Sequence, residues 1–337
     1  MPKPAVARSM PRHALGIGLV CLFAGLGLAA SSAAGFRASA PVVLIGAASS
    51  GATSTFGSLP KTFRLGAPPI AVAISHDSVW VVVETKLCDA QLWQLDAQTG
   101  RRLSAVAIGR AGPDIGAVAV SGTGVWAAAG DHIVYVDPSQ RDRVRRVRVS
   151  GTISGLTVGF GSVWMTTISS QRNLLIRVDP KTLSIRARIR TAGADAVESA
   201  LGSVWVAGGG SLARVNPGSD QLTNVLPLAS PAADLATSPR RLWLLENGSA
   251  LALDQIGHVR RHLALPFAAA RIAVSNERLW AIDNCGCAIG QLAAMDLRTG
   301  RPLTRWAVGA TPVAVAADGD QVWVASFGNS TLLRVRM

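Results

Sequence analysis

The chain has 337 residues, of which 49% are hydrophobic and 16% charged, and its formal net charge is +13. This composition provides enough apolar side chains for one large domain or two ordinary ones, and it argues against disorder over most of the length. The sequence holds no HExxH, GxSxG, P-loop or CxxC motif, so the commonest signatures of metalloproteases, serine hydrolases, nucleoside triphosphatases and thiol redox enzymes are absent.

The N-terminus has the pattern of a secretory signal. Three basic residues, Lys3, Arg8 and Arg12, precede an apolar run over residues 15–28 whose length fits the central region of a signal peptide. Small residues follow, and Ala34 is the predicted last residue before cleavage. Because the uncharged stretch nearly reaches the length of a spanning helix, about 20 residues, an uncleaved membrane anchor is the alternative. Either interpretation predicts an extracytoplasmic protein, which is secreted, periplasmic or anchored to the outer face of the membrane.

Residues 35–60 are rich in Ala, Ser and Gly, a composition typical of a flexible linker. We therefore predict a signal peptide or membrane anchor over 1–34, a linker over 35–60 and a folded domain over 61–337. No stretch after residue 60 keeps a 3.6-residue apolar period over three turns, so we expect the domain to be built from strands.

The folded part repeats a pattern in which an aliphatic residue and a Trp are followed by another apolar residue, as in "GSVWM" and "DQVWV". The seven tryptophans, spaced near 40 residues apart, are Trp80, Trp126, Trp164, Trp205, Trp243, Trp280 and Trp323. Each unit contains four short apolar runs bounded by Gly, Pro, Asn and Asp, and the third run ends on a turn such as "DPKT" or "NPGS". Such runs are typical of four antiparallel strands joined by turns.

Seven units of this kind predict an all-β fold, a seven-bladed β-propeller of four-stranded blades. One twisted sheet cannot bury both of its faces, whereas seven sheets stacked around an axis can, with each Trp filling the wedge between neighbours. The last unit stops after its third strand, while residues 61–67 align with the fourth strands of other units. We predict that 61–67 pairs with 331–337 and closes the ring as an N-terminal, outermost strand, which protects the sheet edges.

With units such as "VWVAGGGSLARVNPGS", the chain resembles the bacterial extracytoplasmic seven-bladed propellers of the YVTN type, whose units read like "VWVAxxxxxxLxxVDPxTG". The resemblance covers about 61–337 and implies the fold, but it implies no activity, because these propellers serve many roles. A more distant likeness is to the streptogramin B lyase group, which has the same propeller and uses metal-assisted His and Glu chemistry. His76 and Glu84, on either side of Trp80, are the nearest counterpart here. They depart from the Trp-Phe-Thr-Glu pattern of that group, and no other unit supplies a partner His.

The loops that join second to third strands are longer in units one, three and six than in units two, four and five. Units six, seven and one are consecutive in a closed ring, so their loops are predicted to border one sector of one face, a natural place for a binding site. The candidate binding residues there are Glu84, Lys86, Asp89, Asp283, Asn284 and Asn329. The alternative is that these residues are ordinary solvated polar residues at loop tips.

Three cysteines, Cys88, Cys285 and Cys287, lie in the long loops of units one and six. An oxidising compartment favours a disulfide, and three cysteines leave one thiol over. A bond from Cys88 to Cys285 or Cys287 would join two loops across unit seven, whereas a bond between Cys285 and Cys287 would form a strained ring. Free thiols are a further alternative, as is zinc bound by the cysteines with Asp89 or Asp283, although that spacing matches no standard zinc site.

Arginine is concentrated in the fourth, outermost strands. The residues concerned are Arg143, Arg145, Arg146, Arg148, Arg186, Arg188, Arg190, Arg260 and Arg261. In "SIRARIR", strand alternation places all three arginines on one face, so we predict a basic belt on part of the outer wall. The belt would protect exposed sheet edges, or it would contact anionic lipid head groups or cell-wall polymers.

We predict that the protein is a non-catalytic binding or scaffold module for a protein or cell-envelope polymer, with an anionic polymer as one candidate. The alternative is a lyase or hydrolase of a small cyclic or ester substrate. We expect no cofactor, no bound metal, no nucleic-acid partner, and a monomer that meets the membrane only through its N-terminal segment.

Overall fold

The computed structural model describes residues 59–337, except 76, 87–88, 111–116, 123, 141–143, 170–171 and 284–285. The predicted signal or anchor over 1–34 and nearly all of the predicted linker lie outside the described residues. Within the described part, no helix is long and apolar enough to span a membrane.

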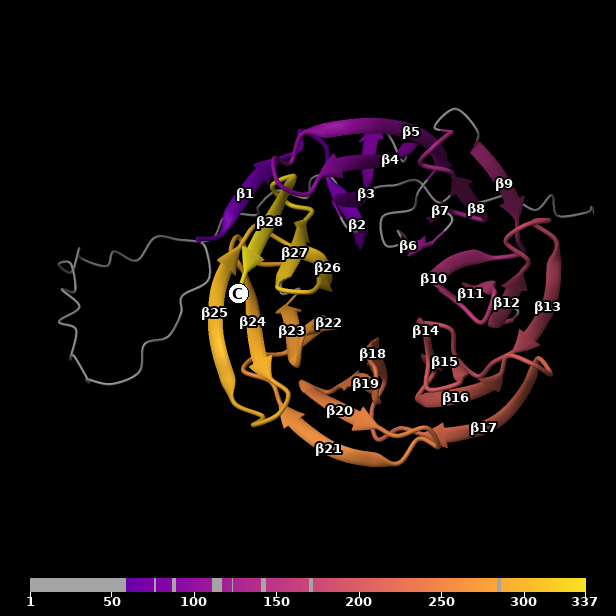
Figure 1. Cartoon of the computed structure of the whole chain (residues 1–337). Coiled ribbons are helices and arrows are strands. Elements are labelled where there is room, and N and C mark those ends of the chain that lie inside the picture. Colours follow the sequence, from indigo (N-terminus) through magenta and orange to yellow (C-terminus); the bar gives the residue numbers. More distant parts are fainter. Residues whose placement is uncertain are drawn as a thin grey trace, which may run out of the picture. The chain divides into compact units, whose positions relative to one another are not determined.

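The described residues form 28 strands in seven antiparallel four-stranded sheets, which are arranged as the blades of a β-propeller (Figure 1). Blade one contains β2 (Pro69–Ser75), β3 (Ser78–Lys86), β4 (Asp89–Asp96) and β5 (Arg102–Arg110), and blade two contains β6 (Val118–Ser121), β7 (Gly124–Ala129), β8 (His132–Val136) and β9 (Val144–Arg148). Blade three contains β10 (Thr152–Gly159), β11 (Ser162–Ile168), β12 (Leu174–Val178) and β13 (Ile185–Arg190), and blade four contains β14 (Ala196–Ala200), β15 (Ser203–Gly208), β16 (Ser211–Asn216) and β17 (Gln221–Pro227).

The remaining blades follow the same order. Blade five contains β18 (Ala232–Ser238), β19 (Arg241–Glu246), β20 (Ser249–Leu253) and β21 (Val259–Ala264), and blade six contains β22 (Ala269–Ser275), β23 (Arg278–Asp283), β24 (Gly290–Asp296) and β25 (Pro302–Val308). Blade seven contains β26 (Pro312–Asp318), β27 (Gln321–Ser326), β28 (Thr331–Arg336) and the N-terminal β1 (Lys61–Arg64). The first strand of each blade lies nearest the centre of the ring, and the fourth forms the outer wall (Figure 1).

The ring closes as predicted. β1 pairs antiparallel with β28, with Phe63 opposite Leu332, and the N–H of Leu65 extends the pairing by donating to the carbonyl of Ser330 at 2.9 Å. The ring of Phe63 stacks on Trp323, with centroids 5.2 Å apart. The first and last segments of the propeller therefore share one sheet and one aromatic contact.

All seven repeated tryptophans are buried, with at most 3% of each residue exposed. Four indole N–H groups donate to the residue five positions earlier, at the turn into the same strand. The pairs are Trp164 with the Gly159 carbonyl, Trp205 with the Ala200 carbonyl, Trp243 with the Ser238 hydroxyl and Trp280 with the Ser275 hydroxyl. Each such Trp contributes a large apolar surface to the packing between blades while its polar group stays bonded.

Antiparallel order gives the propeller two different faces. The loop face carries the loops that join second to third strands and the connections between blades. The turn face, on the opposite side, carries the turns that join first to second strands and third to fourth strands. On the turn face, the Asp or Asn at the end of the third strand organises a tight turn in blades one to six, as predicted. Asp179, for example, accepts hydrogen bonds from the N–H groups of Lys181 and Thr182, both at 2.9 Å. The backbone N–H of Thr182 and the guanidinium of Arg186 hold the pKa of this carboxyl well below its usual range.

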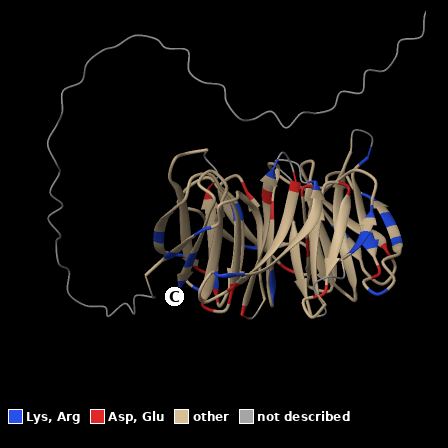
Figure 2. Cartoon of the chain, turned by 90° about the horizontal axis from the view of Figure 1, so that it is seen from above, with Lys and Arg blue, Asp and Glu red and all other residues tan. Residues whose placement is uncertain are grey.

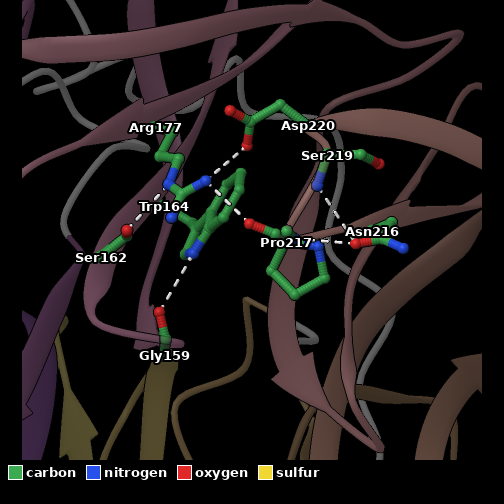
Figure 3. Close-up of polar contacts among 9 residues, drawn as sticks. Gly159, Ser162, Trp164, Arg177, Asn216, Pro217, Ser219 and Asp220 are labelled. Atoms are coloured by element: carbon green, nitrogen blue, oxygen red, sulfur yellow. Dashed lines mark hydrogen bonds and ion pairs between the residues drawn. The ribbon is translucent and has the colours of Figure 1, made fainter.

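Arg177 joins blades three and four (Figure 3). It lies opposite Trp164 in the β11–β12 pair, and its guanidinium is 5.0 Å from the indole centroid. Its Nε donates to the Ser162 hydroxyl at 2.8 Å, while Nη1 donates to the carbonyl of Pro217 at 2.7 Å and pairs with Asp220 at 2.8 Å in the next blade. We call this arrangement the arginine staple, because one side chain covers a Trp and holds the turn of the neighbouring blade.

The predicted basic belt is present in part. Arg186, Arg188 and Arg190 in β13 are exposed and alternate with half-buried apolar residues, and Figure 2 shows Lys and Arg at several places on the outer wall. Several belt arginines bond within the protein, namely Arg145 to the Lys181 carbonyl, Arg146 to the Ala107 carbonyl, Arg148 to Asp131, Arg186 to Asp179 and Arg260 to Asp254. Arg143 lies outside the described residues. Part of the belt therefore connects strands and blades.

Candidate functional site in the central channel

The first strands of the blades converge on the channel, and their inner positions are occupied mainly by small residues. One such position lies opposite the repeated Trp in each blade, and its residues are Ala73, Ala119, Thr157, Glu198, Ala236, Ala273 and Ala316. A second position pairs two residues beyond the Trp, and in six blades its residues are Ala71, Gly155, Ala196, Asp234, Arg271 and Ala314. Three charged residues on consecutive blades thus replace residues that are elsewhere small.

These three residues, Glu198, Asp234 and Arg271, line two adjoining cavities of about 300 and 380 Å³ in the channel. Glu198 and Asp234 are half-buried, and Arg271 is exposed. The first cavity also reaches Ser154 and Asp195, which lie near the loop-face ends of the first strands of blades three and four. The cavity is therefore polar on the side of blades three to six.

Asp234 and Arg271 hold each other's strands. The carboxylate of Asp234 accepts a hydrogen bond from the N–H of Ile272 at 2.9 Å. In return, Nη1 of Arg271 donates to the carbonyl of Ala233 at 3.3 Å, and also to that of Ala270 at 2.9 Å. These bonds fix both side chains at the boundary between blades five and six, so the charges are positioned before any ligand arrives.

The two carboxyl groups differ in their titration. Burial raises the pKa of Glu198 to about 8, and the negative charge of Asp234 adds to the shift. Burial also raises the pKa of Asp234, to about 6, against the opposing charge of Arg271 and the backbone N–H groups of Ile272 and Leu235. Near neutral pH the cavity therefore offers a carboxylic acid, a carboxylate and a guanidinium close together. Perturbed carboxyl groups of this kind in a cavity are typical of functional sites.

No known motif marks these three residues in the sequence, and they were not among the predicted site residues. The signal was present, because "VES" stands where other units read "VAI" or "VAA", and "ADL" and "ARI" stand where other units read "IAV" or "VAV". Aligning the units on the Trp, rather than searching for known motifs, exposes them as exceptions to a row of small residues.

The predicted loop residues lie on the loop face. The backbone N–H of Glu84 donates to the carbonyl of Pro68 at 2.9 Å. Lys86 and Asp89 are paired across the β3–β4 hairpin, and both are exposed. Exposed Asn329 accepts a hydrogen bond from the Thr331 hydroxyl at 2.9 Å.

Asp283 was predicted as a binding residue, with a solvated position at a loop tip as the alternative; it is 5% exposed, which contradicts the alternative, and it accepts a hydrogen bond from the N–H of Gln291 at 2.9 Å. Its carboxylate is thus engaged within its own hairpin. Asn284 lies outside the described residues.

The loops of blades six, seven and one are linked by backbone hydrogen bonds. The N–H of Thr311 donates to the Cys287 carbonyl at 3.4 Å, and the N–H of Phe327 donates to the Thr311 carbonyl at 3.0 Å. The bonds of Leu65 to Ser330 and of Glu84 to Pro68 continue the series into blade one. We call the segments 65–68, 84–86, 286–290, 309–311 and 327–330 the loop rim. Cys287 in this rim is not a free cysteine, while Cys88 and Cys285 lie outside the described residues.

The pair expected from the lyase likeness is not tested, because His76 lies outside the described residues. Ser75, which precedes it, lies at the turn end of the β2–β3 hairpin, whereas Glu84 lies toward the loop end. Among the described residues, no group of three or more His, Cys, Asp and Glu side chains could hold a metal ion.

No family model and no curated protein matches the sequence. Solved structures do match. The WD40 domain of Neurospora crassa Pan2 is 10% identical with a TM-score of 0.63, and the match covers 80% of this chain and 89% of that one. The hydrazine synthase of Kuenenia stuttgartiensis is 15% identical with a TM-score of 0.66, over 82% of this chain and 97% of that one. These likenesses show the fold alone. The resemblance to the YVTN type and to streptogramin B lyases stays a prediction.

Proposed function

We propose that the protein is an extracytoplasmic binding module that receives a protein or cell-envelope polymer on its loop face and takes a polar group of that partner into the channel. The observation that carries the proposal is the placement of Glu198, Asp234 and Arg271 at inner positions where other blades have small residues. A charged side chain at such a position needs bonding partners. Because other blades pack with small residues there, packing between blades does not require these charges, and a ligand in the cavity would supply partners for them.

The chemistry of the cavity defines the group that it would bind. Protonated Glu198 donates a hydrogen bond, the carboxylate of Asp234 accepts, and Arg271 donates while carrying a positive charge. A group with both acceptors and donors, such as a sugar with its hydroxyls or a peptide terminus, fits this set. The loop rim, with exposed Lys86 and Asn329, and the neighbouring exposed Asp89 would contact the body of the same partner.

A capture experiment with matched variants tests the proposal. The wild-type protein, immobilised through its C-terminus, is exposed to envelope fractions of the source cells, and bound proteins and polymers are identified. The triple variant Glu198→Gln, Asp234→Asn and Arg271→Gln is expected to lose the specific partner. A control variant, Arg301→Gln at an exposed position in the turn after β24, should keep it. An unchanged set of captured molecules in the triple variant would refute the role of the channel.

The proposed location rests on the N-terminal pattern of basic, apolar and small residues. N-terminal sequencing of the protein from its native cells tests it. A chain that begins after Ala34 would establish a cleaved signal, whereas an intact N-terminus in the membrane fraction would indicate the anchor. Recovery of the intact chain from the cytoplasm would refute both.

We also propose a disulfide between Cys287 and either Cys88 or Cys285. The support is that Cys287 is not free and that the loops of blades six, seven and one are bonded to one another. Peptide mapping without reduction identifies the pair, and three alkylated thiols in the native protein would refute it.

A second candidate function is hydrolysis or lysis of a small cyclic or ester substrate. The observation that favours it is the pair of carboxyl groups in one cavity whose pKa values are raised to about 8 for Glu198 and about 6 for Asp234. Such a pair can supply a general acid and a general base. Turnover of aryl esters or lactones would support this function if its rate rose with pH near 6, fell near 8 and was lost in Glu198→Gln. Turnover that is absent, or equal in the variant, would exclude it for these substrates.

A further inference from the structure

A separate cavity of about 770 Å³ lies on the turn face between blades five and six. Its walls are the turn that joins β18 to β19, the turn that joins β22 to β23 and the start of the turn that follows β24. Buried Trp243 and Ala252 form part of its lining. The volume is in the range of sites that hold small organic ligands.

The cavity exists because blade five lacks the side chain that fills this space elsewhere. The residues opposite the repeated Trp on the third strand are Gln94, Tyr135, Arg177, Arg214, Ala252, Ala294 and Arg334 in blades one to seven. In blade six, where this residue is also Ala, Trp306 packs against Trp280 with ring centroids 5.8 Å apart. Blade five has Ala252 at this position.

The walls of the cavity are strongly basic. Five arginines line it, against the single carboxylate of Glu277, and they are Arg240, Arg241, Arg260, Arg261 and Arg298. Arg260 pairs with Asp254 at 2.7 Å, Arg261 donates to the Leu297 carbonyl, and Nη1 of Arg241 donates to the Arg240 carbonyl at 3.1 Å. None of the ion pairs among the described residues involves Arg240, Arg241 or Arg298.

Apolar side chains alternate with this charge. Trp243 and Ala252 are buried, and Val274 and Leu297 are half-buried at the cavity wall. A ligand that fills the cavity would therefore meet both an apolar surface and guanidinium groups. Guanidinium groups bind phosphate and carboxylate through paired N–H donors, and they attract anions more strongly where water is excluded.

We propose that this cavity binds an organic anion in which a phosphate or carboxylate group is attached to an apolar body. The anion lies toward Arg240, Arg241 and Arg298, and the apolar body lies against Trp243 and Ala252. The site is on the opposite face from the loop rim, and it does not depend on the function proposed for the channel.

Calorimetric titration of the full protein with 1-naphthyl phosphate tests the proposal, with 1-naphthol and inorganic phosphate as partial probes. We expect naphthyl phosphate to bind about tenfold or more tighter than either partial probe, a difference of about 1.4 kcal/mol or more. Equal binding of naphthol would refute the basic wall as the source of affinity. Equal binding of inorganic phosphate would refute the apolar part of the site.

Two variants locate the binding. Ala252→Arg places in blade five the side chain that blades three, four and seven carry, and it is expected to fill the cavity and reduce affinity about tenfold or more. The double variant Arg240→Gln, Arg298→Gln should have a similar effect by removing charge. Its matched control, Arg188→Gln, Arg190→Gln, removes two exposed charges from β13 and should leave affinity unchanged. If Ala252→Arg does not fold, the charge variants decide, and equal affinity in the double variant and the control would overturn the proposal.

Discussion

The boundary between blades three and four and the boundary between blades five and six are built on the same repeat but end differently on the turn face. In the first, Arg177 covers Trp164 and bonds to the carbonyl of Pro217 and to Asp220. In the second, Ala252 lies opposite Trp243, and a cavity of about 770 Å³ remains. Both boundaries keep the Trp and the turn that follows the third strand, so neighbouring blades pack together in both cases.

The difference shows which positions of the repeat are structural and which are free to vary. The Trp fills the wedge between sheets, and every blade keeps it. The third-strand residue opposite the Trp varies between blades. It ranges from Arg177, which covers the indole on the turn face, to Ala252, which does not. The first strand shows the same division, since small residues keep the channel open and only Glu198, Asp234 and Arg271 depart from them in charge. Ligand sites are expected where such variable positions depart from the filled pattern.

The largest expected effect comes from removing the common element at each boundary. Trp164→Ala and Trp243→Ala should each lower the free energy of unfolding by about 3–5 kcal/mol, because both leave a buried void. Trp164→Ala should cost more, since Arg177 also loses the ring beneath it, whereas the site of Trp243 already adjoins an open cavity. Urea denaturation measures both, with Leu222→Ala at an exposed position as the control. A larger cost for Trp243→Ala would contradict the comparison.

Removing the staple itself should have the next largest effect. Arg177→Ala breaks the bonds to Ser162 and Pro217 and leaves half-buried Asp220 without its ion pair, at an expected cost of about 1.5–3 kcal/mol. Arg177→Lys keeps the charge but not the planar group, and it should recover part of the loss. The reverse change, Ala252→Arg, should alter stability little, because Arg261 already bonds to the Leu297 carbonyl. Chemical denaturation of the three variants distinguishes these outcomes, and a small effect of Arg177→Ala would show that the staple does not hold the blades.

Where they reach the channel, the same two boundaries also differ in charge. The boundary between blades five and six ends on Asp234 and Arg271, whereas the other ends on Gly155 and Ala196. Since burial raises the pKa of Asp234 from 3.8 to about 6, folding favours its protonated form. The stabilisation that Asp234 contributes to the free energy of unfolding is thus complete below pH 3.8 and is lost as the pH rises through about 6.

Asp234→Asn keeps an acceptor for the Ile272 N–H and removes this titration. We expect its melting temperature to exceed that of the wild type by a few degrees at pH 7 and to match it near pH 4. Thermal denaturation at the two pH values measures the difference. Ala71→Ser, at the matching position of blade one, is the control and should show no such pH dependence. A constant offset for Asp234→Asn at both pH values would contradict the assigned pKa.

The fold could be predicted from the sequence because its determinants are local and repeated. Each Trp, each Asp or Asn turn and each apolar run recurs, and the missing fourth strand of the last unit could be matched to residues 61–67. The pairing of Phe63 with Leu332 confirms that match. A periodic signal of this kind survives without knowledge of any contact between blades.

The site could not be predicted in the same way, because it depends on contacts between units. Loop length pointed to blades six, seven and one, which stays a prediction, and in those loops Asp283 is buried and bonded to Gln291. Glu198 and Asp234 lie 36 residues apart in sequence, and only the packing of blade four against blade five brings their first strands together at the channel. The cavity beside Ala252 is equally invisible in sequence, since an Ala opposite a Trp is filled in blade six by Trp306 and remains open in blade five.

The smallest expected effect tests whether an exposed arginine can replace a staple. Arg145 lies over Tyr135, 4.7 Å from the ring centroid, and donates to the Lys181 carbonyl in blade three at 3.0 Å. Because Arg145 is exposed, its attraction to the ring is weakened by water, and Arg145→Ala should cost about 0.5–1 kcal/mol. A double-mutant cycle with Tyr135→Leu measures the part that belongs to the ring. If the coupling energy were as large as that between Arg177 and Trp164, a buried staple would contribute no more than an exposed arginine contact. The difference between the boundary of blades three and four and that of blades five and six would then be one of cavity volume alone.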